Sequence, residues 1–229
     1  MYIVSRLIKI LLVGLFIFGL GGVHISLAAG PEVILSWKAK ESFVPQGYLG
    51  KALPSPLSMV EVKAIAIEGG RLVDLSDYQI RWFLKNYRVA QGQGLTTFTV
   101  PAPLKNTDES HDLRVEIVDY PGGAVTKSVS IPIVLPRVVL SGGSLDGSLS
   151  YGSYTVLARP YFFMAQALSD LDYQWTVDGV YRGQDSGGVL KLNVTGDKSR
   201  GGMVEVQVGV RSPNNPFDQA ATRRTFVVR

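Results

Sequence analysis

The stretch that decides the fold is YQIRWFL, residues 78–84. Every second side chain from Tyr78 to Leu84 is apolar, whereas Gln79 and Arg81 between them are polar. A period of two is typical of an antiparallel strand that buries one face and exposes the other. This stretch therefore predicts a strand whose tryptophan points into a core.

The same period of two recurs along the chain, at residues 113–117 and again at residues 204–210. Turn signals separate these runs: residues 121–123 read Pro-Gly-Gly, and Asp178-Gly179 is a two-residue hairpin signal. No convincing helical period is present after residue 30. Because the 25 glycines and 12 prolines also suit many short strands joined by turns, we expect an all-β protein.

Internal repetition organises the strands into two copies of one unit. Residues 80–84 align with residues 173–177 at an offset of 93, and the offset drifts only slightly further along the chain. A unit of about 95 residues with a strand every ten or so fits a seven-strand sandwich. We therefore expect two tandem antiparallel β-sandwiches, at residues 31–134 and 135–229.

Each copy carries one tryptophan in the repeated strand, Trp82 in the first and Trp175 in the second. A large ring there fills the space between two sheets, so both are expected to be core residues. Sugar stacking, the functional alternative for a tryptophan, is left to Trp37 or to the exposed aromatic residues described below. The junction at residues 133–137, IVLPR, has no Gly/Ser spacer and is expected to be stiff.

The chain starts like an exported protein. Arg6 and Lys9 precede an apolar run at residues 10–23, which a small-residue stretch ending in Ala29 follows, the order of a secretory signal. The run is shorter than the roughly 20 residues that span a bilayer. Residues 1–30 are therefore expected to be a signal peptide, with a retained helical membrane anchor as the alternative, and the protein is expected in the cell envelope or outside the cell.

Charge and composition exclude several classes of protein. The net charge is +4, and after residue 30 it falls to 21 basic against 19 acidic groups, too near neutrality for binding nucleic acid through phosphate neutralisation. The chain has no cysteine, so its domains are held by their cores and not by disulfides.

The tryptophan strands carry a family resemblance. The sequence Tyr173-Gln174-Trp175-Thr176-Val177-Asp178-Gly179, followed by Ser186-Gly187-Gly188, resembles bacterial PKD-like and Ig-like surface modules. Residues 43–54 and 158–163 also resemble exported tandem-sandwich proteins of Parcubacteria-type bacteria. The PKD signature W-D-F-G-D-G, the immunoglobulin disulfide and the tyrosine corner are absent. The resemblance implies a non-catalytic, envelope-exposed module and supplies no site residue.

The candidates for catalysis and metal binding are few. His111 is the only histidine after residue 30; its neighbour Asp112 faces the other way on a strand, and no G-x-S-x-G elbow accompanies them, so His111 is expected to be a solvated strand-end residue. Turn aspartates such as Asp74 and Asp170 form no D-x-D-x-D-G loop, although a calcium ion in these loops is the alternative. We expect no enzyme, no cofactor and no metal site.

Exposed aromatic residues are the remaining route to function. The segment at residues 41–58 is rich in proline and glycine, and it is either a recognition loop or an Ω-like loop that closes the end of the first sandwich. The run at residues 161–164 is either a buried strand end or an apolar patch that packs on the neighbouring module. Alternation cannot bury all four side chains, so some contact beyond the strand's own sheet is expected. The candidate binding surface comprises Phe43, Tyr48, Leu49, Tyr161, Phe163 and Tyr181.

The sequence thus predicts a non-catalytic, exported module that serves as a surface spacer or an adhesion domain pair. Its partner is expected to be a protein or a glycan at the cell surface, with a membrane contact only through an uncleaved leader. The first alternative is a carbohydrate-binding module. The second is a subunit of a pilus or secretion assembly, which pairs through the exposed edge of the C-terminal strand.

Overall fold

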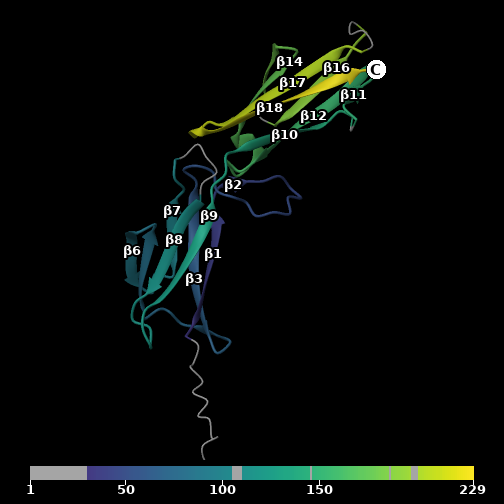
Figure 1. The fold of residues 1–229 in the computed structure, drawn as a ribbon. Helices are drawn as coiled ribbons and strands as arrows, with labels where there is room; N and C mark the ends of the chain where they lie inside the picture. The colour runs from purple at the N-terminus through teal and green to yellow at the C-terminus, as the bar shows by residue number, and fades with distance from the viewer. Residues whose placement is uncertain (1–29, 105–109, 145, 186, 197–200) are drawn as a thin grey trace, which may run out of the picture. The chain divides into compact units, whose positions relative to one another are not determined.

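The structure, a computed structural model, describes residues 30–104, 110–144, 146–185, 187–196 and 201–229. Regular structure in these residues consists of β-strands and one short 3₁₀ turn, Leu168–Asp170 (Figure 1). The expected all-β class is therefore confirmed. The predicted signal or anchor helix lies outside the described residues.

The first half of the described chain forms two four-stranded sheets. In one, β1 and β4 pair with β3, which also pairs with β7, and in the other the strand order is β6-β5-β8-β9. The strands of the first sheet are β1 (Glu32–Ala39), β3 (Met59–Glu68), β4 (Arg71–Val73) and β7 (Thr97–Pro101). Those of the second are β5 (Gln79–Leu84), β6 (Tyr87–Gln93), β8 (Ser110–Ile117) and β9 (Val125–Pro132).

Both sheets contribute side chains to one core, whose members run from Val33 to Ile133. Trp82 on β5 is fully buried, and its indole Nε1 donates a hydrogen bond of 2.8 Å to the Leu95 carbonyl. The Trp82 ring also stacks on Phe98 of β7, with centroids 5.8 Å apart. Because β5 and β7 belong to different sheets, the tryptophan joins them.

The second half forms sheets of three and five strands, in the orders β10-β12-β16 and β11-β18-β17-β14-β15. The three-stranded sheet contains β10 (Arg137–Gly142), β12 (Gly152–Tyr161) and β16 (Val189–Val194). The five-stranded sheet contains β11 (Ser148–Leu149), β14 (Asp172–Val177), β15 (Val180–Asp185), β17 (Met203–Ser212) and β18 (Asn215–Val228). All pairs are antiparallel except β11 with β18, which is parallel.

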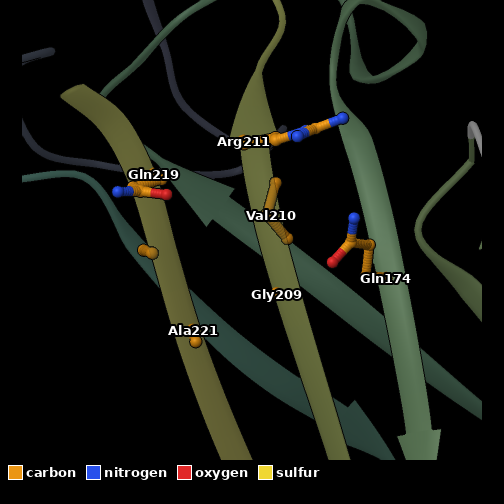
Figure 2. Close-up of a pocket in the computed structure, with 7 residues that line it drawn as sticks. Gln174, Gly209, Val210, Arg211, Gln219 and Ala221 are labelled. Carbon is orange, nitrogen blue, oxygen red and sulfur yellow. The ribbon is translucent and has the colours of Figure 1, made fainter. Parts of the chain in front are cut away.

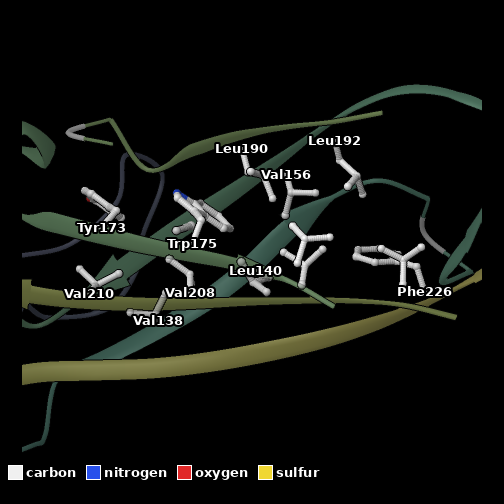
Figure 3. Packing of buried hydrophobic residues seen from close by; sticks show 14 of the residues in the cluster. Val138, Leu140, Val156, Tyr173, Trp175, Leu190, Leu192, Val208, Val210 and Phe226 are labelled. Atoms are coloured by element: carbon white, nitrogen blue, oxygen red, sulfur yellow. The ribbon is translucent and has the colours of Figure 1, made fainter. Parts of the chain in front are cut away.

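The second core runs from Val138 to Val228 and again contains side chains from both sheets (Figure 3). Trp175 is 2% exposed, and Tyr173 and Val208 beside it are fully buried. The Trp175 Nε1 has no hydrogen-bond partner in the described part of the chain. The valines of β17 at 204, 206, 208 and 210 point inward, as their period of two predicted.

Both copies of the repeated strand have an irregular register immediately after the tryptophan. On β5 and β6, Trp82 pairs with Ala90 and Phe83 with Arg88, so one residue of β6 is left over. On β14 and β15 the same shift occurs between Trp175 and Thr176. Such bulges increase the local twist and interrupt the edge of a sheet.

The hairpin that joins β14 to β15 turns at the residues that the sequence indicates. Asp178 and Gly179 adopt φ of 50° and 76°, the two positive values that a tight two-residue turn between twisted strands requires. Asp178 contributes further, because its Oδ1 accepts a hydrogen bond from the Glu205 N–H at 2.9 Å.

A small additional sheet joins residues from the two halves. In it β2 (Ser42–Phe43) pairs antiparallel with β13 (Phe163–Met164). Phe43 also packs against the second core, although it lies in the first half of the sequence. Phe43 is thus a residue of the first half that packs on the core of the second half. The boundary between residues 134 and 135 stays a prediction.

Candidate binding surfaces

The predicted aromatic surface residues form an internal contact. The ring of Tyr48 meets those of Tyr161 and Phe162 edge-to-face, with centroids 5.8 and 5.9 Å apart. The Phe162 N–H donates a hydrogen bond of 2.7 Å to the Phe43 carbonyl. Most of this aromatic area is therefore used to join residues 42–48 to residues 161–164.

Backbone geometry explains how the run at residues 161–164 buries two consecutive rings. Phe162 has a φ of 64°, so it leaves the extended conformation between β12 and β13. The alternation of the strand is broken there, and Phe162 is 8% and Phe163 0% exposed. Phe163 is consequently a core residue in this structure and not part of an exposed surface.

The segment at residues 41–58 was expected to be either a recognition loop or a loop that closes the first sandwich, and its two parts differ. Its first part contacts residues 161–164, as described above. In its second part, Pro54 accepts a hydrogen bond from the Val134 N–H, and Ser58 accepts one from the Ala102 N–H, so it closes the end of the first sandwich. Leu49 at the tip of the segment is fully exposed and remains free for a partner.

An apolar groove of about 780 Å³ lies beside this contact. Its walls are residues 43–47, residues 157–160 of β12 and residues 187–189. Pro160 pairs with Val138 of β10 on one side. On its other side it lies beyond the residues that pair with β16, between the hydrogen bonds that the Ala158 N–H donates to Gly188 and the Phe162 N–H donates to Phe43. A proline there lacks the N–H that an added strand would need.

A buried carboxylate lies next to the same region. Asp218 on β18 is 1% exposed; its Oδ2 accepts a hydrogen bond from the Met164 N–H at 2.6 Å, while its Oδ1 has no partner in the described part of the chain. Burial raises the pKa of Asp218 to about 6, against the opposite effect of the hydrogen bond from the Met164 N–H. Asn215 binds across the halves, since its Nδ2 lies 3.5 Å from the Pro56 carbonyl.

The outer face of the five-stranded sheet has a shallow depression of about 310 Å³ (Figure 2). Its floor is formed by Gly209 and Ala221, which are paired across β17 and β18 and carry almost no side chain. Gln174, Arg211 and Gln219 stand around it, and Arg211 is paired with Asp172 at 3.2 Å. Polar side chains thus stand around a floor of small residues.

The outer face of the sheet β6-β5-β8-β9 carries a row of three side chains that the sequence interpretation missed. Phe83 on β5 pairs in register with Arg88 on β6 and with Arg114 on β8. The Arg114 guanidinium carbon lies 4.0 Å from the centre of the Phe83 ring. The sequence places Phe83 on the polar face of its strand, but only the register brings two arginines from distant segments to its sides.

One tyrosine is exposed at each of the two equivalent hairpins. Tyr87 at the start of β6 is 78% exposed, and Tyr181 on β15 is 60% exposed. Tyr181 belongs to the predicted surface, and the structure places it on a different element from the cluster around Tyr48. Trp37, the candidate for sugar stacking, has the Lys51 ammonium 3.5 Å from its ring centre and packs on the first core.

His111 is buried and not solvated, which corrects the expectation from sequence. It is 4% exposed, and its Nε2 has no hydrogen-bond partner in the described residues. Burial lowers the pKa of His111; Asp112 acts in the opposite direction, and Lys85 lowers it further. The strand position that looked like an exposed end is covered, because Ile131 on β9 pairs with it.

The turn aspartates mainly bind their own backbone. Asp74 accepts a hydrogen bond from the Ser76 N–H, and Asp170 accepts from the Gln166 and Ala167 N–H groups; in each case these bonds lower the pKa of the carboxyl. Asp146 is held by Ser144, Ser148 and Arg229, which lower its pKa strongly. In the described ranges, no three His, Cys, Asp or Glu residues are grouped closely enough to hold a metal ion.

The C-terminal strand is not an isolated edge. β18 lies between β17 and β11 in its sheet, although β11 covers it only at Val227 and Val228. The residues described here include no helix that is long and apolar enough to cross a membrane.

Comparisons with known proteins give likeness of fold only. No family model and no curated protein matches the chain. Three N-terminal domains of the bacteriophage RB49 highly immunogenic outer capsid protein are similar at 12% identity and a TM-score of 0.48, over 86% of this chain and 59% of that one. The chain thus spans less than two thirds of the length of that capsid fragment.

Two further solved structures are similar at lower scores. Fibronectin(III)-like modules of Clostridium thermocellum CbhA share 12% identity at a TM-score of 0.29, over 82% of this chain and 94% of theirs. The D1–D4 ectodomain fragment of ICAM-5 shares 10% identity at 0.32, over 86% of this chain and 53% of its own length. We base no functional conclusion on these likenesses.

Proposed function

We propose that the chain is an exported, non-catalytic surface protein that binds a partner through side chains on its two sandwiches, residues 31–134 and 135–229. Export rests on the basic and apolar leader at residues 1–30. We also propose that the chain is related to exported tandem-sandwich proteins of Parcubacteria-type bacteria, which residues 43–54 and 158–163 resemble. The partner is a protein or a glycan at a cell surface.

The observation that carries the proposal is the pair of hairpin tyrosines. Tyr87 and Tyr181 project from equivalent hairpins, and both expose more than half of their surface. Large amphipathic rings at the edge of a rigid sheet offer contact area at a low cost in conformational entropy. Catalysis has no comparable support, because His111 is buried and Asp112 points to the opposite face of its strand.

Partner binding by these hairpins can be measured directly. Fluorescently labelled full-length chain is expected to bind intact bacterial cells saturably. The double substitution Tyr87→Ser with Tyr181→Ser is expected to weaken that binding about tenfold, because one or two aromatic residues of the interface are lost. Leu72→Ser is the control, since Leu72 is 74% exposed on a different strand, β4. Binding that is absent, or that all three substitutions reduce equally, would contradict the proposal.

Assembly through strand pairing has less support than partner binding. Two of the edge strands, β6 and β15, have bulges beside the tryptophan strand, and bulges interrupt the regular row of groups that an added strand needs. Carbohydrate binding is the second candidate, and the arginines beside Phe83 favour it.

A further inference from the structure

We propose that the outer face of the sheet β6-β5-β8-β9 binds an acidic polysaccharide, through an arginine row that consists of Arg88, Phe83 and Arg114. This inference rests on the proposed surface-binding function and names the ligand class for one of the two sandwiches.

Strand register builds the row. Phe83 is paired with Arg88 on one side and with Arg114 on the other, and paired residues point to the same face of a sheet. Trp82, the preceding residue, points into the core, so the row lies on the outer face. Two strand spacings separate the arginines, about 10 Å of sheet.

The charge of the two arginines is not neutralised within the described part of the chain. Neither has a carboxylate partner there, and the Arg114 guanidinium lies over the Phe83 ring. The two carboxylates on this face are already engaged: Glu116 lies 3.7 Å from Arg81, and Asp112 accepts a hydrogen bond of 2.7 Å from Ser130. Two like charges beside one ring attract an anion, and guanidinium groups bind carboxylates through paired hydrogen bonds.

The surroundings of the row favour a sugar polymer over a peptide. Exposed amide and hydroxyl side chains lie next to it, namely Gln91, Thr126 and Ser128. Such groups bind sugar hydroxyls, whereas a protein hot spot requires a desolvated apolar pocket. An extended peptide that added to β6 would meet the bulge between the Trp82 and Phe83 pairs. An exposed arginine binds one anion weakly, so a polymer that presents several is the ligand that this surface can hold.

The second sandwich supplies a natural control for this surface. The residues at the positions of Phe83, Arg88 and Arg114 are Thr176, Tyr181 and Gln207, which are paired in the same manner and carry no charge. The repeat therefore keeps the register and changes the chemistry. Acidic polysaccharide is expected to bind the first sandwich alone.

The test uses the full-length chain and immobilised polygalacturonate at low salt. Replacing both arginines, Arg88→Gln with Arg114→Gln, is expected to weaken binding about tenfold, as the loss of charge-assisted hydrogen bonds implies. The matched control is Arg182→Gln with Arg223→Gln, which removes the same charge from exposed positions of the second half. The control is expected to change binding less than about twofold, because Arg182 and Arg223 lie on the sheet of the second half, where uncharged residues occupy the positions of the arginine row. Thermal unfolding checks that both variants are folded.

The inference is wrong if the chain does not bind polygalacturonate, or if the two double variants lose the same affinity for it. It is also wrong if poly-glutamate competes as effectively as polygalacturonate, or if the chain binds phosphatidylglycerol vesicles more strongly than polygalacturonate. The cell-binding assay with Tyr87 and Tyr181 is independent of these results. If it succeeds while polygalacturonate fails, the proposed function stands and the acidic polysaccharide is wrong. If the chain binds polygalacturonate but the tyrosine substitutions leave cell binding unchanged, the arginine row stands and the role of the hairpin tyrosines is wrong.

Discussion

The two sandwiches place their tryptophans alike but satisfy them differently. Trp82 donates a hydrogen bond to the Leu95 carbonyl and stacks on Phe98. Trp175 is buried to a similar extent, yet its indole N–H has no partner in the described chain. The repeat has thus kept a large ring between the sheets, which packing requires, while the polar interaction is present in one copy only.

The outer faces of the matching sheets differ more than the cores. The first presents the arginine row, and the second presents a polar depression over Gly209 and Ala221. Core residues must fill a fixed space between sheets, whereas outward residues meet only solvent or a partner. The repeat thus specifies a scaffold, and the binding chemistry is set separately on each copy.

The largest effect that the comparison predicts comes from emptying either core. Trp82→Ala and Trp175→Ala should each reduce the free energy of unfolding by about 3–5 kcal/mol, because the cavity is only partly filled by relaxation. Chemical denaturation monitored by circular dichroism measures this. The exposed ring of Tyr181 is the control, and Tyr181→Ala should cost no more than about 0.5 kcal/mol. A loss below about 1 kcal/mol for Trp175→Ala would contradict its place in the core.

The buried carboxylate of the second half predicts the next largest effect. Asp218 has its pKa raised from 3.8 to about 6, so its charged form disfavours the folded state. The penalty is absent below pH 4, grows as the pH rises and is complete above pH 6 or so. Asp218→Asn should therefore raise the free energy of unfolding at pH 7.5 by about 2–3 kcal/mol.

Denaturant titrations of the wild-type and Asp218→Asn chains from pH 4 to pH 8 test this prediction. The two chains should converge at pH 4 and separate as the pH rises. The Asn side chain can still accept the Met164 N–H, so the fold is kept. If both chains lose the same stability between pH 4 and pH 7.5, Asp218 is not the source of the pH dependence.

Replacing each tryptophan with phenylalanine, which has no N–H, isolates the difference between the two tryptophans. Trp82→Phe should cost about 1 kcal/mol more than Trp175→Phe, since it alone leaves a carbonyl without its donor. The two rings are otherwise replaced by the same smaller ring in equally buried sites. Equal losses in equilibrium unfolding would show that the hydrogen bond to Leu95 contributes nothing net.

The smallest expected effect concerns the buried histidine of the first half. Because the pKa of His111 is lowered from 6.5, the unfolded chain binds its proton more readily than the folded one. Its contribution to stability is complete above pH 6.5 and is lost as the pH falls, the opposite sign to Asp218. In an Asp218→Asn background, His111→Gln should flatten the decline in stability from pH 7 to pH 5. An unchanged slope in the pH titration would exclude His111 as its source.

Much of the fold could be predicted from the sequence because it depends on local patterns. The period of two at Val204–Val210 and the turn at Asp178-Gly179 are both present in the structure. Strand alternation and positive φ are properties of adjacent residues, so they can be seen without any tertiary contact. The repeat then indicated which strands are equivalent.

The surfaces could be predicted far less well. Phe163 was named for a binding surface, with a buried strand end as the alternative, and His111 was expected to be solvated; both are buried. Burial of Phe163 depends on the left-handed Phe162 and on pairing with Phe43, a residue 120 positions away in the chain. No local pattern reports such a distant contact, nor does one report that Arg88 and Arg114 lie on either side of Phe83.

The sequence by itself determined that this protein is built of strands with tryptophans inside, because alternation and turn chemistry act over a few neighbouring residues. Only the tertiary structure decided which aromatic rings stay free and where the unpaired positive charge lies. Those properties depend on register between strands that the chain brings together from far apart, and a shift of one residue in any pairing would turn every side chain of that strand to the opposite face.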